Sequence, residues 1–384
     1  WVIEGMAEYL SVGRVDAHTA MWLRAAILLD RLPTLTELTV DPRFFPYRYG
    51  QAVWAYIGGR WGDRAVPLLY RRSLLIGWER AVKEVLGLST DELSSQWIEA
   101  VRAAYLPLMQ GRVAPRAVGR RVTAEESGAG EMNLGPALSP DGRYVAFFSD
   151  VDLFSIDLFL ADARTGEVLE KLTSSAANPH FEALAFLRSA GTWSPDGQKF
   201  AFVVFDEGDN ALAILDVASR DVEQKIRVDR VGEIRDPAWS PDGREIAFSG
   251  NSGGVSDLYV LDVETSAVRQ LTNDQWAQLQ PAWSPDGRTI AFMTDRTTGA
   301  DRLTALTAGR YGLATLDVAS GRVTPIETFT TGKAINPRYS PDGSSLYFVA
   351  DPDGFQNVFR VDLRTGELYR VTNVATGASG VTAT

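Results

Sequence analysis

Cysteine is absent from the sequence, and histidine occurs only twice among its 384 residues, as His18 and His180. The lack of cysteine excludes disulfide bonds, thiolate metal sites and a cysteine nucleophile. The two histidines are far apart and cannot form the i, i+4 pair of a His-Glu-x-x-His zinc site. No apolar run approaches the roughly 18 residues that cross a membrane, so we expect no membrane-spanning segment.

Positive charge is also scarce, because 38 Lys and Arg against 49 Asp and Glu give a formal charge of −11. Residues 1–115 are close to neutral, so the acidic excess lies in the rest of the chain. An acidic surface repels nucleic acid phosphates and anionic lipid headgroups. The charge pattern therefore argues against nucleic acid and favours basic or neutral protein surfaces as partners.

A tetrad, Ser-Pro-Asp-Gly, occurs five times and defines a repeat. Pro presets φ for the second position of a type I turn, Asp suits the third, and Gly supplies a positive φ at the exit. Counting the strand before each turn, every repeat contains four short apolar strands. The spacing of 44 to 56 residues is close to the period of a propeller blade, and it predicts an all-β propeller over residues 133–384. The tetrads lie at residues 139–142, 194–197, 240–243, 284–287 and 340–343.

Aromatic residues precede most of these turns. Trp193, Trp239 and Trp283 stand before three of them, and Leu138 and Tyr339 stand before the other two. Because the five positions are equivalent in the repeat, we interpret these residues as packing between blades rather than as an aromatic ligand site.

The pattern Pro-Ala-Trp-Ser-Pro-Asp-Gly-Arg-x-Ile-Ala-Phe, at residues 237–248 and 281–292, resembles the WD40-like PD40 repeat of the TolB-like β-propellers. The resemblance covers roughly residues 115–384. It implies a periplasmic, non-enzymatic scaffold that binds proteins of the cell envelope, without a cofactor or a small-molecule substrate. Such a scaffold could be an extrinsic subunit of a membrane-associated complex, for example a respiratory or photosynthetic one.

The closure of the ring requires one more blade than the five tetrads provide. Residues 118–123 resemble the outer strand at 268–272, although the fifth repeat already has its own outer strand at 367–372. We therefore expect six blades, with residues 115–123 as the outer strand of the sixth and 373–384 as its beginning. On this interpretation, the sequence, which starts with Trp1, is truncated at both ends.

Residues 1–110 show the periodicity of a separate helical domain. Ser89-Thr-Asp-Glu92 is a capping box that opens the last helix, and Gly87 fits the end of the preceding one. Residues 111–132, which include four arginines, are expected to be a linker with the outer strand. The fold class is thus α plus all-β. The expected helices span residues 1–12, 16–32, 47–61, 63–75, 79–86 and 90–109.

The opening segment Trp1-Val-Ile-Glu-Gly-Met-Ala-Glu-Tyr9 resembles a segment of gluzincin metallopeptidases, and the resemblance covers about the first 110 residues. It implies that Glu4 corresponds to the third zinc ligand and Glu8 to a residue behind it. Without a histidine pair, this chain cannot complete the zinc site, so we expect no catalytic residue and no bound metal. Glu4 alternatively serves only a helix N-terminus. A competing hypothesis is a zinc peptidase whose His-Glu-x-x-His lies upstream and whose propeller presents or filters substrate.

Two long insertions, at residues 174–192 and 296–311, supply the candidate partner-binding residues. Their apolar density is high for connections that run over a surface. They either fold back over the propeller channel or form an exposed patch that a partner covers. The candidates are Phe181, Leu184, Phe186, Leu187, Leu303, Leu306 and Tyr311.

Overall fold

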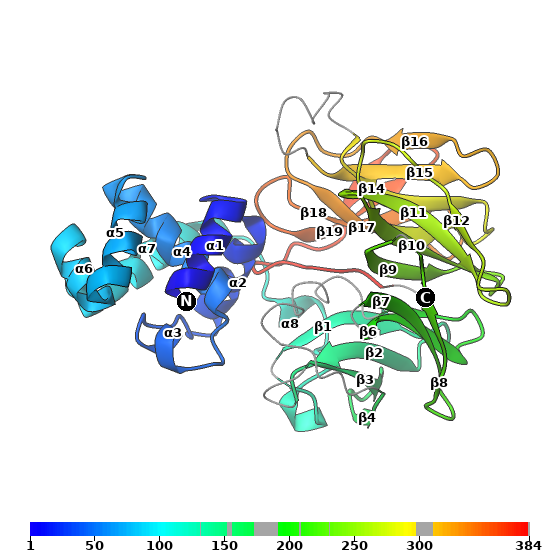
Figure 1. Cartoon of the computed structure of the whole chain (residues 1–384), viewed down its shortest axis with the longest axis horizontal. Coiled ribbons are helices and arrows are strands. Elements are labelled where there is room, and N and C mark those ends of the chain that lie inside the picture. Colours follow the sequence, from blue (N-terminus) through cyan, green and yellow to red (C-terminus); the bar gives the residue numbers. More distant parts are fainter. Residues whose placement is uncertain are drawn as a thin grey trace. The chain divides into compact units, whose positions relative to one another are not determined.

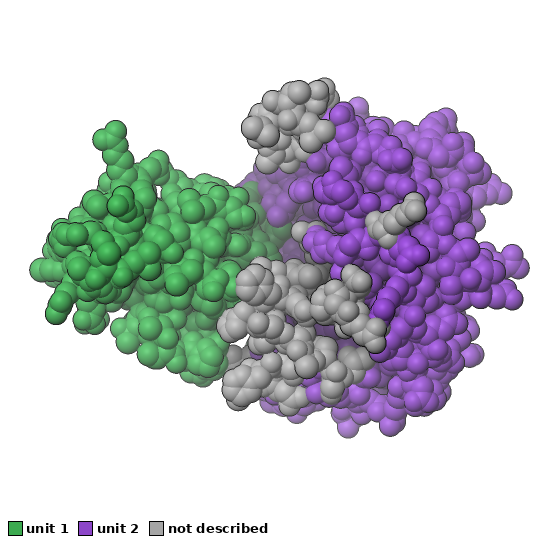
Figure 2. Space-filling view, viewed as in Figure 1, with its two compact units in different colours: residues 1–118, 354–356, 373–377 green, residues 119–353, 357–372, 378–384 purple. Residues whose placement is uncertain are grey.

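The computed structural model describes residues 1–130, 132–151, 156–172, 191–206, 209–229, 231–296 and 310–382. The chain forms two compact units, which Figure 2 colours separately. Unit 1 consists of Trp1–Val118 with the short segments Gly354–Gln356 and Asn373–Gly377. Unit 2 consists of Gly119–Asp353, Asn357–Thr372 and Ala378–Thr384. The helices and the four-stranded sheets confirm the expected α plus all-β class.

Unit 1 is helical (Figure 1). Its six longer helices match the six expected ones to within four residues at each end, whereas the one-turn helices α3 and α8 were not expected. The helices are α1 Val2–Val12, α2 Ala17–Leu28, α3 Glu37–Val40, α4 Pro46–Trp61, α5 Ala65–Ile76, α6 Trp78–Leu86, α7 Thr90–Met109 and α8 Pro115–Val118.

The caps of α6 and α7 confirm the local predictions. Ser89 Oγ accepts a hydrogen bond from the Glu92 backbone N–H at 3.1 Å, and Glu92 Oε2 accepts one from the Ser89 backbone N–H at 2.7 Å. This reciprocal pair satisfies N–H groups that the first turn of a helix leaves without partners. Gly87 ends α6 in the left-handed region, at φ 76°.

Two segments from late in the sequence join unit 1 through Arg24 of α2, which is only 1% exposed. Its Nε and Nη2 donate hydrogen bonds to the Thr376 carbonyl at 3.1 and 2.8 Å. Its guanidinium also lies 4.0 Å from the centre of the Phe355 ring. A short parallel bridge pairs Val113 with Val374. Residues 354–356 and 373–377 therefore complete the core of the helical unit.

Unit 2 contains five sheets of four antiparallel strands, each formed by consecutive strands of the chain. The first strand of each sheet is the innermost and the fourth is the outermost. Figure 1 shows this order in the first sheet, from β1 to β4. The five sheets are β1 Asn133–Leu138, β2 Tyr144–Ser149, β3 Asp157–Asp162 and β4 Val168–Lys171; β5 Thr192–Trp193, β6 Lys199–Asp206, β7 Asp209–Asp216 and β8 Val222–Arg227; β9 Glu233–Trp239, β10 Glu245–Ser252, β11 Val255–Asp262 and β12 Val268–Gln270; β13 Gln278–Trp283, β14 Thr289–Thr294, β15 Gly312–Asp317 and β16 Val323–Ile326; β17 Ala334–Tyr339, β18 Ser345–Ala350, β19 Asn357–Asp362 and β20 Leu368–Arg370.

Each Ser-Pro-Asp-Gly tetrad forms the turn between the first two strands of its sheet. In the third sheet, the Gly243 N–H donates to the Ser240 carbonyl at 3.0 Å, and Gly243 has a φ of 77°. Ser240 Oγ donates to Asp242 Oδ1 at 2.6 Å and accepts from the Glu245 N–H at 2.9 Å. The other four tetrads repeat these contacts, so the turns have the expected geometry.

Successive sheets pack through apolar side chains of alternating size. On the second strands, Ala146, Ala201, Ala247 and Ala291 contact larger side chains of the following sheet. Small residues on one face and large residues on the other allow the sheets to interlock at close range. Residues predicted to pack between blades join these contacts, as Trp193 and Trp239 do.

A relay of hydrogen bonds continues from the last innermost strand into residues 381–382. The Asn336 N–H donates to Gln280 Oε1 at 2.7 Å, and the Val381 N–H donates to Asn336 Oδ1 at 3.2 Å. The two hydrogen bonds are equivalent: the N–H of Asn336 bonds to a side chain of β13, and the N–H of Val381 bonds to a side chain of β17. Val381 therefore lies beside β17 in the way that Asn336 lies beside β13. On the other side, the Leu138 N–H donates to Thr382 Oγ1 at 3.2 Å. Residues 381–382 thus connect β17 to β1.

The expected outer strand at residues 118–123 was wrong. Helix α8 occupies Pro115–Val118, and residues 119–123 are in no strand of the described structure. Val122 instead packs beside the apolar cluster of the first sheet that contains Phe147 and Phe159. A strand requires a partner whose backbone groups it can pair with, and no described strand provides one here. The expectation of a sixth blade stays a prediction.

Candidate functional site

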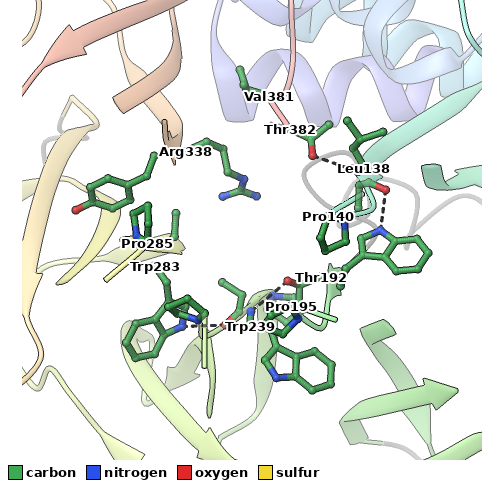
Figure 3. A pocket seen from close by; sticks show the side chains of 18 of the residues that line it. Leu138, Pro140, Thr192, Pro195, Trp239, Trp283, Pro285, Arg338, Val381 and Thr382 are labelled. Carbon is green, nitrogen blue, oxygen red and sulfur yellow. Dashed lines mark hydrogen bonds between the residues drawn. The ribbon is translucent and has the colours of Figure 1, made fainter. Parts of the chain in front are cut away.

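A cavity of about 470 Å³ lies at the centre of unit 2 (Figure 3). All five innermost strands contribute to its wall, together with the turns that follow them and residues 379–382. We call it the central cavity. Its volume is within the range of pockets that hold small molecules or a few side chains of a peptide.

The Ser-Pro-Asp-Gly turns form one edge of the central cavity. In the first four turns, the Pro lies against the Gly of the next turn, as Pro140 does with Gly197 and Pro241 with Gly287. Each of these glycines has a positive φ, which a residue with a Cβ atom adopts only at a cost. The edge is therefore built from fixed turns rather than from long side chains.

The indole groups stabilise the wall. Trp193 Nε1 donates to the Ala137 carbonyl of the preceding sheet at 2.9 Å, and Trp283 Nε1 donates to the Ala238 carbonyl at 3.0 Å. These contacts confirm the interpretation of both residues as packing between blades. Trp239 differs, because its Nε1 donates to Gly243 of its own turn at 3.0 Å.

Arg338 is the one charged side chain among the described residues that line the central cavity. In Figure 3 its guanidinium points into the open centre of the cavity. Its Nη1 donates to the carbonyl of Pro337 at 3.0 Å. Burial lowers the pKa of Arg338 below its usual value, and the charge of Asp236 acts in the opposite direction. The cavity thus combines a partly desolvated cation with walls of mixed polar and apolar character.

Sequence reasoning missed Arg338, although the repeat contains the signal. The residue two positions before the Ser of each tetrad is small in the first four repeats and arginine only in the fifth. The first four are Ala137, Thr192, Ala238 and Ala282. The side chains that face one another around the cavity therefore change from small to large and charged at a single place.

Most of the predicted partner-binding residues fall outside the residues that the structure describes. Only Tyr311 is described; it is half-buried, and its carbonyl accepts a hydrogen bond from the Ala334 N–H at 3.0 Å. The residues outside are Phe181, Leu184, Phe186, Leu187, Leu303 and Leu306.

Glu4 and Glu8, from the gluzincin-like segment, lie on α1 near partners on α4. Burial first, and then a hydrogen bond to Glu4, raise the pKa of Tyr47 to about 12. The Glu8 carboxylate forms an ion pair with Arg48 at 2.6 Å, and Arg48 also lies 3.3 Å from Asp16. Within the described ranges, no three His, Asp or Glu side chains are grouped to hold a metal ion. The structure thus gives Glu8 a packing role inside the helical unit.

None of the helices in the described part of the chain has both the length and the apolar character needed to span a membrane. Residues 188–303 match the family model described as PD40, the TolB beta propeller domain. No curated protein matches the chain.

Three solved structures illustrate the likeness. A putative TolB from Agrobacterium tumefaciens is 24% identical, with 62% of this chain and 80% of that chain covered and a TM-score of 0.50. TolB from Acinetobacter baumannii is 19% identical, with 74% and 60% covered and a TM-score of 0.45, so this chain spans less than two thirds of that protein. Hydrazine synthase of Kuenenia stuttgartiensis is 20% identical, with 66% and 68% covered and a TM-score of 0.42. The family model and the Agrobacterium structure together show that unit 2 has the fold of a TolB-like β-propeller.

Proposed function

We propose that this protein is a non-enzymatic binding scaffold whose propeller takes a segment of a partner protein into the central cavity. The observation that carries the proposal is the cavity itself, which five strands build and fixed turns edge. A cavity whose walls are held by hydrogen bonds between sheets is formed before the partner arrives, so binding costs little ordering of the scaffold.

The excess of Asp and Glu over Lys and Arg outside unit 1 indicates that the partner is a protein rather than a nucleic acid. A formal charge of −11 repels phosphate backbones, whereas basic or neutral protein surfaces are attracted or tolerated. A cavity whose walls are both polar and apolar, with one cation, suits a short peptide segment that carries apolar and polar groups.

Site-specific photocrosslinking in cells that produce the protein tests this proposal. A photoreactive phenylalanine analogue replaces Ser379, beside the central cavity, or Thr324, on the exposed outer strand β16. We expect protein adducts from position 379 and none from position 324, and mass spectrometry identifies the partner. No adduct at position 379, or equal adducts at both positions, would contradict the proposal.

The TolB-like fold also supports a finer proposal about location. We infer that the protein acts in the periplasm with partners of the cell envelope, for example as an extrinsic subunit of a membrane-associated complex. Cell fractionation tests this inference: the protein should leave the cytoplasmic fraction and should be released from membranes by high salt. Recovery from the cytoplasm alone would exclude it.

A second candidate is a zinc metallopeptidase of which this chain is one part. The segment Trp1–Tyr9 favours it, because Glu4 and Glu8 lie one turn apart on α1 as in the gluzincin-like pattern. On this proposal, a His-Glu-x-x-His helix from elsewhere in the protein supplies the other ligands, and the propeller presents or filters substrate. Sequencing the encoding DNA upstream of Trp1 decides between the candidates.

A further inference from the structure

Arg338 breaks the pattern that the other four sheets share at the central cavity. On the innermost strands, Ala137, Ala238 and Ala282 pair across the sheet with an alanine of the second strand. In the fifth sheet the corresponding pair is Arg338 with Tyr347. A large cation therefore stands where the close packing of the ring elsewhere requires a small side chain.

The described surroundings of Arg338 do not neutralise it. No carboxylate of the described residues lies within ion-pair distance of its guanidinium. Asp236 influences it only through the charge. Among the described residues, its one hydrogen bond is to the carbonyl of Pro337, and it uses one of the five N–H donors of the group. A partly desolvated guanidinium with donors that point into a cavity is arranged to receive an anion.

The size of the charge decides which anion fits. One guanidinium matches the single charge and the two oxygens of a carboxylate, with which it forms parallel hydrogen bonds. A phosphate dianion would need further cations, and the described lining of the cavity provides none. The prolines of the turns at the edge of the cavity offer apolar surface for an apolar side chain next to that carboxylate.

We propose that Arg338 binds a carboxylate of the partner segment, either an acidic side chain or a C-terminal carboxylate, with an apolar neighbour held by the cavity wall. This inference rests on the proposed function and adds the chemistry of the recognised group. The exterior of the protein is acidic, so a local cation in the cavity also selects where on the propeller a carboxylate can bind.

Three synthetic peptides test the recognition of the carboxylate and separate its two sources. The first, Ac-Gly-Phe-Glu-Gly-NH2, has only a side-chain carboxylate; the second, Ac-Gly-Phe-Gln-Gly-OH, has only a C-terminal one. The third, Ac-Gly-Phe-Gln-Gly-NH2, has neither. Calorimetric titration of the full chain should show that at least one acidic peptide binds about tenfold or more tightly than the neutral one.

Variants assign this preference to Arg338. In Arg338→Gln the preference for the acidic peptide should vanish, and in Arg338→Lys part of it should return. Arg364→Gln, in the exposed turn before β20, removes a cation elsewhere and should keep the full preference. Thermal unfolding of each variant shows whether the fold is retained. Equal affinity for all three peptides, no binding of any of them, or an unchanged preference in a folded Arg338→Gln chain would overturn the inference.

The photocrosslinking experiment separates this inference from the function on which it rests. If Arg338→Gln still yields the adduct at position 379, while the peptide preference does not depend on Arg338, the scaffold function stands and the carboxylate site is rejected. If the wild-type chain yields no adduct, the scaffold function itself fails.

Discussion

Gly5 of α1 and Gly50 of α4 meet backbone to backbone in the core of the helical unit. A Cβ atom on Gly5 would lie 2.4 Å from the carbonyl carbon of Gly50, and one on Gly50 would lie 2.7 Å from the Cα of Gly5. Such contacts are too short for any side chain, so both positions require glycine. The glycine of the gluzincin-like segment is therefore explained by packing of this unit alone.

Gly50→Ala should destabilise unit 1 by about 2–4 kcal/mol, because the helices must separate to admit the methyl group. Gly59 lies on the same helix with open space around it. Gly59→Ala is the matched control and should be neutral or stabilising by up to about 1 kcal/mol, since alanine favours helix. Urea unfolding followed by helical circular dichroism measures both; equal stability of the two variants would show that the close contact is not required.

The turn aspartates should make the stability of unit 2 depend on pH. Hydrogen bonds from the Ser340 hydroxyl and then the Ser344 N–H lower the pKa of Asp342 from 3.8 to about 2. A lowered folded pKa means that the ionised carboxylate stabilises the fold above pH 3.8 and that this contribution is lost as the pH falls through about 2.

The difference in Tm between the wild-type chain and Asp342→Asn measures this contribution. It should be constant above about pH 5 and should shrink as the pH falls from about 4 to 2. A difference that stays constant down to pH 2 would mean that the charge of Asp342 does not stabilise the turn.

The contrast between these sites shows what the sequence can and cannot predict. The Ser-Pro-Asp-Gly turns and the Ser89 cap were predictable, because their contacts join residues a few positions apart. The contact of Arg24 with Thr376 was not, because it joins residues about 350 positions apart. The strand expected at residues 118–123 failed for a related reason: a local pattern identifies a strand, but only the fold provides its partner.

The lack of a histidine pair beside Glu4 leads to a prediction about zinc content. The chain of Trp1–Thr384 should bind no stoichiometric zinc, because Glu4 has no histidine pair in this sequence to act with. Metal analysis of the purified chain, dialysed against zinc, measures this. Stoichiometric zinc that is lost in Glu4→Gln would contradict the prediction and place a metal site on α1.

The apolar insertion at residues 174–192 gives a prediction about partner contacts beyond the central cavity. Replacement of Phe181 and Phe186 by Ser should reduce the yield of the adduct at position 379 if these side chains are covered by the same partner. Leu169→Ser, at a position 48% exposed on β4, is the control for a surface apolar residue and should change nothing. An unchanged adduct in the double variant, with the fold intact, would exclude the insertion from the docking surface.

The relay from Gln280 through Asn336 to Val381 can be tested one link at a time. Asn336 has a positive φ of 59°, which asparagine tolerates better than most residues, and its Oδ1 accepts the Val381 N–H. Asn336→Gly keeps the conformation and removes the acceptor, so it should cost about 1 kcal/mol. Asn336→Ala removes the acceptor and strains the backbone, so it should cost about 1 kcal/mol more.

Hydrogen exchange then locates the effect. Loss of the acceptor should speed exchange of the Val381 amide in both variants, because its partner is gone in both. The Asn336 amide, which donates to Gln280 Oε1, should exchange faster only in Asn336→Ala, where the strained backbone disturbs that second link. Unchanged exchange at Val381 in both folded variants would show that residues 381–382 are held to β17 by other contacts. Faster exchange there would identify Asn336 as the residue that holds this segment beside the innermost strand.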